Sequence, residues 1–115
     1  MMRALELAAQ AAAMGEVPVG AVVVQKSTGR IIGEGYNRRE ADRSPLAHAE
    51  IMAIDAASRT LGGWRLLDSA LYVTLEPCPM CAGAILHARL EQVVYGTADP
   101  KGGAVDSVEQ LFTLP

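Results

Sequence analysis

Runs of β-branched and apolar residues alternate along the chain with segments whose apolar residues recur at helical spacing. Two β-branched runs, over 17–25 and 30–37, flank the turn sequence KSTG and predict a hairpin. Two further strands are predicted over 69–76 and 92–96. Apolar spacing of three or four residues predicts helices over the following ranges: 3–14, 46–62, 79–90 and, at the end of the sequence, 107–112.

This order of elements indicates the class of fold. A helix, a hairpin and then helices alternating with strands are typical of a mixed sheet that helices cover on both faces. We therefore expect an α/β protein of three layers, in which the hairpin and parallel strands form the central sheet. With 115 residues, the chain suits a single domain over 1–115.

Composition limits the classes of function. Charged residues make up 20% of the chain, which argues against disorder. A net charge of −3 is unlike that of proteins that bind duplex nucleic acid through bulk charge, so any such contact needs a local patch. No apolar run approaches the roughly 20 residues of a membrane span, and we expect no signal peptide. Two cysteines without an export signal predict a reducing, cytoplasmic location.

The only two cysteines, Cys78 and Cys81, lie where a predicted strand meets a predicted helix. Pro79 suits the first helical position, which makes Cys78 the N-cap and places Cys81 in the first turn. The helix dipole then favours the thiolate form of both residues. The spacing alone leaves three interpretations open: a redox dithiol, half of a zinc site, or two small buried side chains.

His48 and Glu50 lie near the start of the helix predicted over 46–62. Each has an ordinary interpretation, the histidine as a packed residue and the glutamate as a surface carboxylate. Together with Cys78 and Cys81, however, His48 completes three zinc ligands and leaves one coordination position for water, as in catalytic zinc sites. Glu50 could then move the proton of that water. The combination of H-x-E with P-C-x-x-C is the known signature of zinc-dependent nucleobase deaminases.

On these residues the chain resembles the cytidine and deoxycytidylate deaminase superfamily, and within it the bacterial tRNA-specific adenosine deaminases. The stretches that carry the resemblance are GEVPVGAVVV (15–24), IGEGYNR (32–38), HAEIMAI (48–54), LYVTLEPCPMCAGAILHARL (71–90) and VVYGTADPKGGA (93–104). The resemblance implies a cytidine-deaminase-like fold and conversion of the wobble adenosine of a tRNA anticodon stem-loop to inosine. It also implies a homodimer that builds each RNA-binding cleft from both subunits, and a chain that lacks the family's C-terminal helices.

The resemblance further implies roles for individual residues. One zinc ion per chain would be held by His48, Cys78 and Cys81, and Glu50 would carry protons between the water and the base. The residues implied to contact the substrate are the apolar Val17 and Ala47, the backbone around Pro77, Asn37 beside the base or sugar, and Asp99 beside the nucleotide backbone. The residues themselves leave a simpler alternative open, because Asn and Asp commonly turn the chain after a strand.

Two other functions stay open at this point. The same zinc chemistry could act on a free base or nucleoside, such as cytosine, guanine or cytidine. Alternatively, Cys78 and Cys81 could form a redox or structural CxxC module without enzymatic activity.

Overall fold

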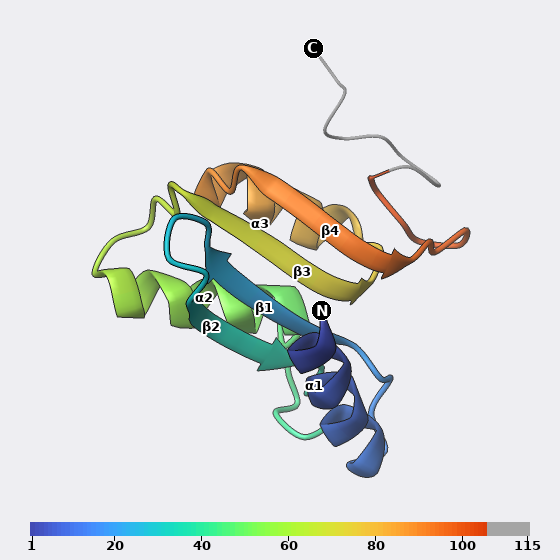
Figure 1. The fold of residues 1–115 in the computed structure, drawn as a ribbon. Helices are drawn as coiled ribbons and strands as arrows, with labels where there is room; N and C mark the ends of the chain where they lie inside the picture. The colour runs from blue at the N-terminus through green and yellow to red at the C-terminus, as the bar shows by residue number, and fades with distance from the viewer. Residues whose placement is uncertain (106–115) are drawn as a thin grey trace.

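A computed structural model describes residues 1–105 of the chain (Figure 1). The helix predicted over 107–112 lies outside the described residues. The described elements follow the predicted order and are α1 (Met2–Ala13), β1 (Gly20–Gln25), β2 (Ile31–Tyr36), α2 (Ala49–Leu61), β3 (Ser69–Leu75), α3 (Pro79–Ala88) and β4 (Gln92–Thr97). Within residues 1–105, no helix has both the length and the apolar character needed to cross a bilayer.

The four strands form one mixed sheet in the order β2-β1-β3-β4. β1 pairs antiparallel with both β2 and β3, whereas β3 and β4 run parallel. The helix α3 makes the crossover between the two parallel strands, as parallel pairing requires. The predicted combination of a hairpin with parallel strands is confirmed.

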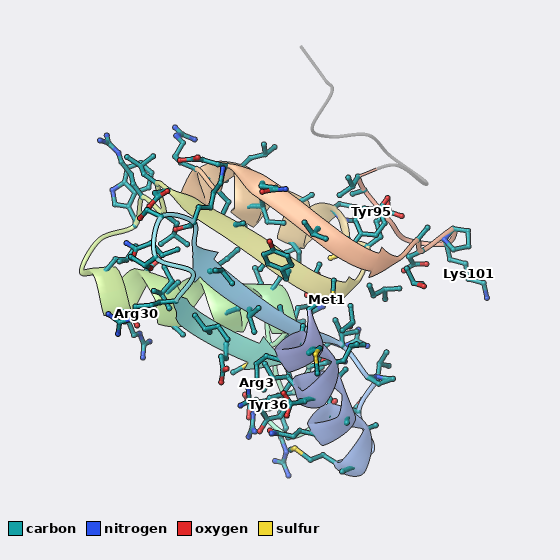
Figure 2. The ribbon with its side chains drawn as sticks, viewed as in Figure 1. Met1, Arg3, Arg30, Tyr36, Tyr95 and Lys101 are labelled. Atoms are coloured by element: carbon teal, nitrogen blue, oxygen red, sulfur yellow. The ribbon has the colours of Figure 1, made fainter. Side chains whose placement is uncertain are left out.

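Helices cover both faces of the sheet, which confirms the three predicted layers. Figure 1 shows α1 on one side of the sheet and α2 with α3 on the other. α1 packs across β1 and β2, and its Arg3, labelled in Figure 2, forms an ion pair of 2.7 Å with Glu34 of β2. The main core lies on the opposite face, where the buried residues include Val23, Leu71 and Val73 of the sheet, Ala53 and Ala57 of α2, and Ile85 of α3.

Two elements begin later than their apolar patterns predict. The strand predicted over 17–25 starts only at Gly20, since Pro18 has no N–H to donate and Val19 donates its N–H to Val17 O at 2.9 Å. The helix predicted over 46–62 starts only at Ala49. The carbonyl of Ala47 accepts the Arg38 N–H at 2.9 Å, and this bond ties the preceding segment to the loop after β2.

Candidate metal centre and adjoining cavity

Two helix N-termini meet at one end of the sheet and carry the three predicted metal ligands. His48 is the N-cap of α2, and Cys78 is the N-cap of α3, with Pro79 at the first helical position as predicted. Cys81 follows in the first turn of α3 and is fully buried. α3 begins just after β3 ends, so the direction of this one strand places both sulfur atoms opposite the start of α2.

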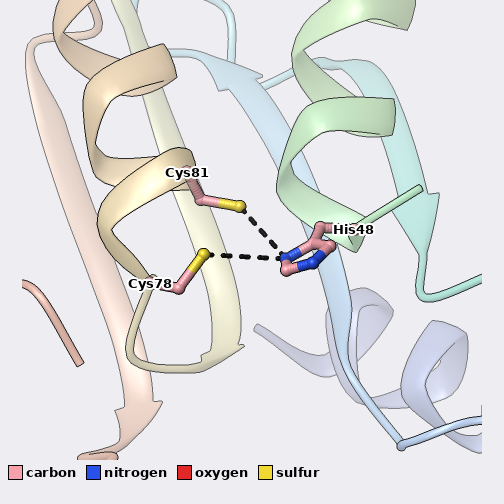
Figure 3. Close-up of side chains that lie close together, drawn as sticks. All are labelled: His48, Cys78 and Cys81. Atoms are coloured by element: carbon pink, nitrogen blue, oxygen red, sulfur yellow. Dashed lines mark hydrogen bonds between the residues drawn. The ribbon is translucent and has the colours of Figure 1, made fainter. Parts of the chain in front are cut away.

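The three side chains converge on one point (Figure 3). His48 Nδ1 lies 3.7 Å from Cys78 Sγ and 3.5 Å from Cys81 Sγ. The three ligand atoms all lie within 4.8 Å of one another. In tetrahedral zinc sites, with Zn–S near 2.3 Å and Zn–N near 2.0–2.1 Å, neighbouring sulfur and nitrogen ligands are about 3.6 Å apart. The observed distances therefore fit a zinc ion, and two sulfurs with one imidazole are ligands that zinc favours.

The two thiols interact strongly with each other. Hydrogen bonding from Cys81 lowers the pKa of Cys78 to about 5. The same hydrogen bond, together with burial, raises the pKa of Cys81. The two shifts favour the thiolate form at Cys78 and the thiol form at Cys81, whereas the helix dipole alone predicts thiolates at both positions. A metal ion held by both sulfurs would displace the remaining proton.

Glu50 lies beside this cluster, in the first turn of α2. Its side chain is buried, with only 4% of the residue exposed. Burial is the main cause that raises the pKa of Glu50 to about 7, and the nearby Cys78 raises it further. A carboxyl group with a pKa near 7 can both accept and donate a proton at neutral pH, as a general acid–base group must.

A cavity of about 250 Å³ opens directly onto Glu50 and the cluster. The ends of β2, β3 and β4 and the segment before β1 all contribute to its wall. The lining residues are Val17, Val19, Asn37, Arg39, His48, Ala49, Glu50, Leu75, Glu76, Cys78, Asp99 and Gly102.

The structure places most of the predicted site residues around this cavity, but not all of them. Val17, Asn37 and Asp99 line it, as does Glu50. Ala47 is buried outside the lining, and Ala49 occupies the wall instead. Pro77 is also absent from the lining, and its carbonyl accepts the Ala104 N–H at 2.8 Å.

Asn37 has the structural role that its sequence position left open, and its contact with a substrate stays a prediction. Its Nδ2 donates to Val17 O at 3.2 Å, and its Oδ1 accepts the Arg39 N–H at 3.2 Å. The side chain thus joins two segments of the cavity wall. It is 4% exposed and still borders the cavity, so its amide can also face a ligand there.

A family model described as the cytidine and deoxycytidylate deaminase zinc-binding region matches residues 1–97. The chain belongs to this deaminase family. The model spans His48, Glu50, Cys78 and Cys81, so its zinc-binding region coincides with the cluster that geometry selects. The resemblance seen in the sequence is confirmed.

The chain is also similar to individual deaminases, both in sequence and in solved structures. The tRNA-specific adenosine deaminase of Haemophilus influenzae is 55% identical over 113 residues, which are 97% of this chain and 65% of that protein. The chain thus spans about two thirds of that relative's length. A structure from studies of A-to-I editing by tRNA:A34 deaminases matches 100% of this chain and 87% of its own, with a TM-score of 0.95 and 48% identity. Guanine deaminase from Bacillus subtilis matches 99% of this chain and 82% of its own, with a TM-score of 0.79 and 34% identity.

Several lining residues of this deaminase-family cavity were not predicted. They are Val19, Arg39, Ala49, Leu75, Glu76 and Gly102. Of these, Glu76 had no signal in the sequence that would show its burial, although a glutamate buried at the end of a strand needs partners for its carboxylate. The others have no distinctive spacing and reach the cavity because the ends of the strands and the start of α2 meet there.

Proposed function

We propose that the protein is a zinc-dependent hydrolase that deaminates the wobble adenosine of a tRNA anticodon to inosine. The observation that carries this proposal is the cluster of His48, Cys78 and Cys81 beside the buried Glu50, at the floor of a cavity. Similarity to tRNA-specific adenosine deaminases over nearly the whole chain supports this choice of substrate.

In the proposed reaction the metal ion activates a water, and Glu50 transfers the protons. A zinc ion at His48, Cys78 and Cys81 would supply a water acidic enough to lose a proton near pH 7. Glu50 would accept that proton and deliver it to N1 of adenine, which makes C6 electrophilic. The hydroxyl group added at C6 would then give its proton to Glu50, which would pass it to the departing amino group, so that water and adenosine give inosine and ammonia.

The cavity suits one extruded base. Its volume of about 250 Å³ lies below the ~300–1,000 Å³ range of pockets for drug-sized ligands. Enzymes that modify bases in nucleic acid extrude the target nucleotide into such a pocket. In the proposed complex Val17 packs against the base, Asn37 hydrogen-bonds the base or its sugar, and Asp99 contacts the nucleotide backbone. Arg39, which also lines the cavity, adds a local positive charge beside the phosphates.

We propose that the protein acts as a homodimer through the outer face of α3. This helix is apolar on its outward face as well as on its core face, which is unusual for a helix that faces solvent. Leu86 on the outward face is 46% exposed, and the neighbouring Met80, Gly83 and Ala84 are half-buried. A second copy would cover these residues and bring its own loops toward the tRNA. The same proposal places the protein in the cytoplasm, where tRNA is present and both thiols stay reduced.

Replacing Leu86 with glutamate should convert the dimer to a monomer at equal protein concentration. The charge would have to be buried within the apolar contact. Light scattering coupled to size exclusion measures the change in mass. Leu5→Glu is the matched control, because Leu5 is 56% exposed on α1, on the opposite side of the sheet. An L86E protein that remains dimeric would contradict this interface.

The proposed activity is tested with the purified full-length protein and an anticodon stem-loop that carries adenosine at the wobble position. We expect about one zinc ion per chain by elemental analysis and conversion of that adenosine to inosine. The same loop with adenosine moved to another position should react far more slowly. Zinc-loaded protein that forms no inosine would overturn the proposed substrate.

The same experiment separates the alternatives. Similarity to guanine deaminase favours one specific competitor, a deaminase of a free base. Release of ammonia from guanine, cytosine or cytidine, without inosine in the stem-loop, would establish it. Absence of zinc together with a reversible disulfide between Cys78 and Cys81 would instead indicate a redox module.

A further inference from the structure

A second buried glutamate lies at the cavity, and the proposed reaction gives it no role. Glu76 directly follows β3, two residues before Cys78, and only 2% of it is exposed. A buried carboxylate is stable only when its oxygens accept hydrogen bonds or face a positive charge. Its partners therefore indicate what the residue does.

The carboxylate of Glu76 holds the loop over 98–105, which follows β4. Oε1 accepts the N–H of Asp99, and Oε2 accepts the N–H of Val105, each at 3.0 Å. These two contacts grip the loop near both of its ends. Hydrogen bonds to an ionised acceptor are stronger than those between neutral groups, so the carboxylate holds the loop more firmly than an amide would.

Backbone contacts reinforce this attachment. The Glu76 N–H donates to Thr97 O, and the Ala104 N–H donates to Pro77 O, both at 2.8 Å. The loop is thus fastened to the same short segment that continues into the metal ligand Cys78. Its tip, at Lys101, projects away from the sheet (Figure 2).

Gly103 shows how closely the loop approaches the carboxylate. A Cβ atom added at Gly103 would lie 2.3 Å from Glu76 Cδ and 2.5 and 2.6 Å from its two oxygens. Any side chain at this position must push the carboxylate away. Glycine is therefore required for the loop to lie flat against Glu76.

The loop in turn presents Asp99 to the cavity. Asp99 lines the cavity wall, and its Oδ1 accepts the N–H groups of Lys101 and Gly102 at 3.0 and 3.2 Å. These bonds order the turn around Asp99, whereas the bond from its own N–H to Glu76 fixes where that turn sits. The position of the Asp99 carboxylate thus depends on Glu76.

We propose that Glu76 is a positioning residue that holds the loop over 98–105 against the cavity and so places Asp99 for contact with the substrate nucleotide. This inference rests on the proposed function for its substrate. It assigns Glu76 no contact with the reacting atoms. Because Glu76 and Cys78 lie in one short segment, Glu76 also fixes the position of the loop over 98–105 relative to the metal ligand Cys78.

The first test measures the loop itself by amide hydrogen exchange. In Glu76→Gln the new NH₂ group faces a backbone N–H, and protection of the Asp99 and Val105 amides should fall about tenfold or more. Gly103→Ala should have the same effect by displacing the carboxylate. Glu91→Gln is the matched control, because Glu91 accepts the Asp68 N–H at 2.6 Å at the other end of β3. Its substitution should free Asp68 and leave Asp99 protected.

The second test measures the consequence for the reaction on the anticodon stem-loop. In Glu76→Gln we expect kcat/KM to fall about tenfold, mostly through KM, while zinc content and melting temperature stay close to wild type. In an Asp99→Ala background the same substitution should have little further effect, because both changes remove the same contact between Asp99 and the substrate. Two independent structural defects would instead add.

The outcomes separate this inference from the proposed function. If wild-type protein forms no inosine, the proposed function fails, and the exchange data still decide whether Glu76 holds the loop. If wild type is active but Glu76→Gln leaves both exchange and kcat/KM unchanged, the inference is overturned. Additive losses in the Asp99→Ala background would also overturn it.

Discussion

Replacing Glu50 with glutamine is expected to lower the rate of inosine formation by about a thousandfold, within the 10²–10⁴ range that proton transfer by a positioned group contributes. Glutamine keeps the shape of the side chain but cannot accept the proton of the water or deliver it to N1. The chemical step is measured directly under single-turnover conditions with the anticodon stem-loop. Binding of the stem-loop should change little, because the change removes proton transfer and preserves the cavity wall.

Zinc content and stability distinguish this result from a folding defect. Glu50 is not one of the three clustered ligands, so E50Q should keep its full complement of zinc. Burial raises the pKa of Glu50, which shows that its charged form is disfavoured there, so a neutral amide should not lower the melting temperature. Asp55→Asn is the control on the same helix, since Asp55 is exposed and paired with Arg59. Retention of near-wild-type turnover by E50Q would remove the acid–base role.

The pattern of elements could be predicted because it follows from local rules. β-branched runs, helical spacing and the Gly and Pro residues between them gave the order of helices and strands. The entry to α3 was predicted to the residue, since Pro79 can occupy the first turn of a helix but not its interior. The first residues of β1 and α2 were not, because the bonds of Val19 and of Ala47 depend on neighbouring segments.

The metal ligands could be predicted because their chemistry is rare in this chain. Two cysteines and a single well-placed histidine leave few combinations, and the H-x-E spacing supplied the acid. Residues of common type were harder to assign. Which of the two alanines, Ala47 or Ala49, lines the cavity depends on how the chain turns before α2. The role of Glu76 becomes clear only from its contact with the loop over 98–105.

The role of the two glycines in β2 could not be predicted from the sequence. The run IIGEGY predicts a strand but gives no reason for glycine at 33 and 35. In the structure both glycines face α2, whose backbone lies directly against them. That close approach brings the start of α2, with His48 and Glu50, down to the level of the sulfur atoms on α3.

Substitution of Gly35 by valine should therefore damage both the fold and the site. A Cβ atom at Gly35 would lie 2.4 Å from Ala49 O, 2.7 Å from Ala53 N and 2.8 Å from Met52 Cβ. Two of these are backbone atoms that cannot rotate away, so α2 must move as a whole. We expect a loss of about 3 kcal/mol in the free energy of unfolding, a melting temperature about 15 °C lower, and weaker zinc binding. Calorimetry and zinc titration measure the two effects.

Gly63→Ala is the control for this prediction, because Gly63 is exposed beyond the other end of α2 and an added Cβ would meet nothing within 4 Å. It should change stability by no more than about 0.5 kcal/mol. The loss of stability in Gly35→Ala should lie between those of Gly35→Val and Gly63→Ala, since it adds the clashing Cβ atom without the branches of valine. A G35V protein with the melting temperature and the zinc affinity of wild type would mean that the position of α2 does not depend on contact with β2. The position of His48 and Glu50 opposite the two sulfurs would then need another cause.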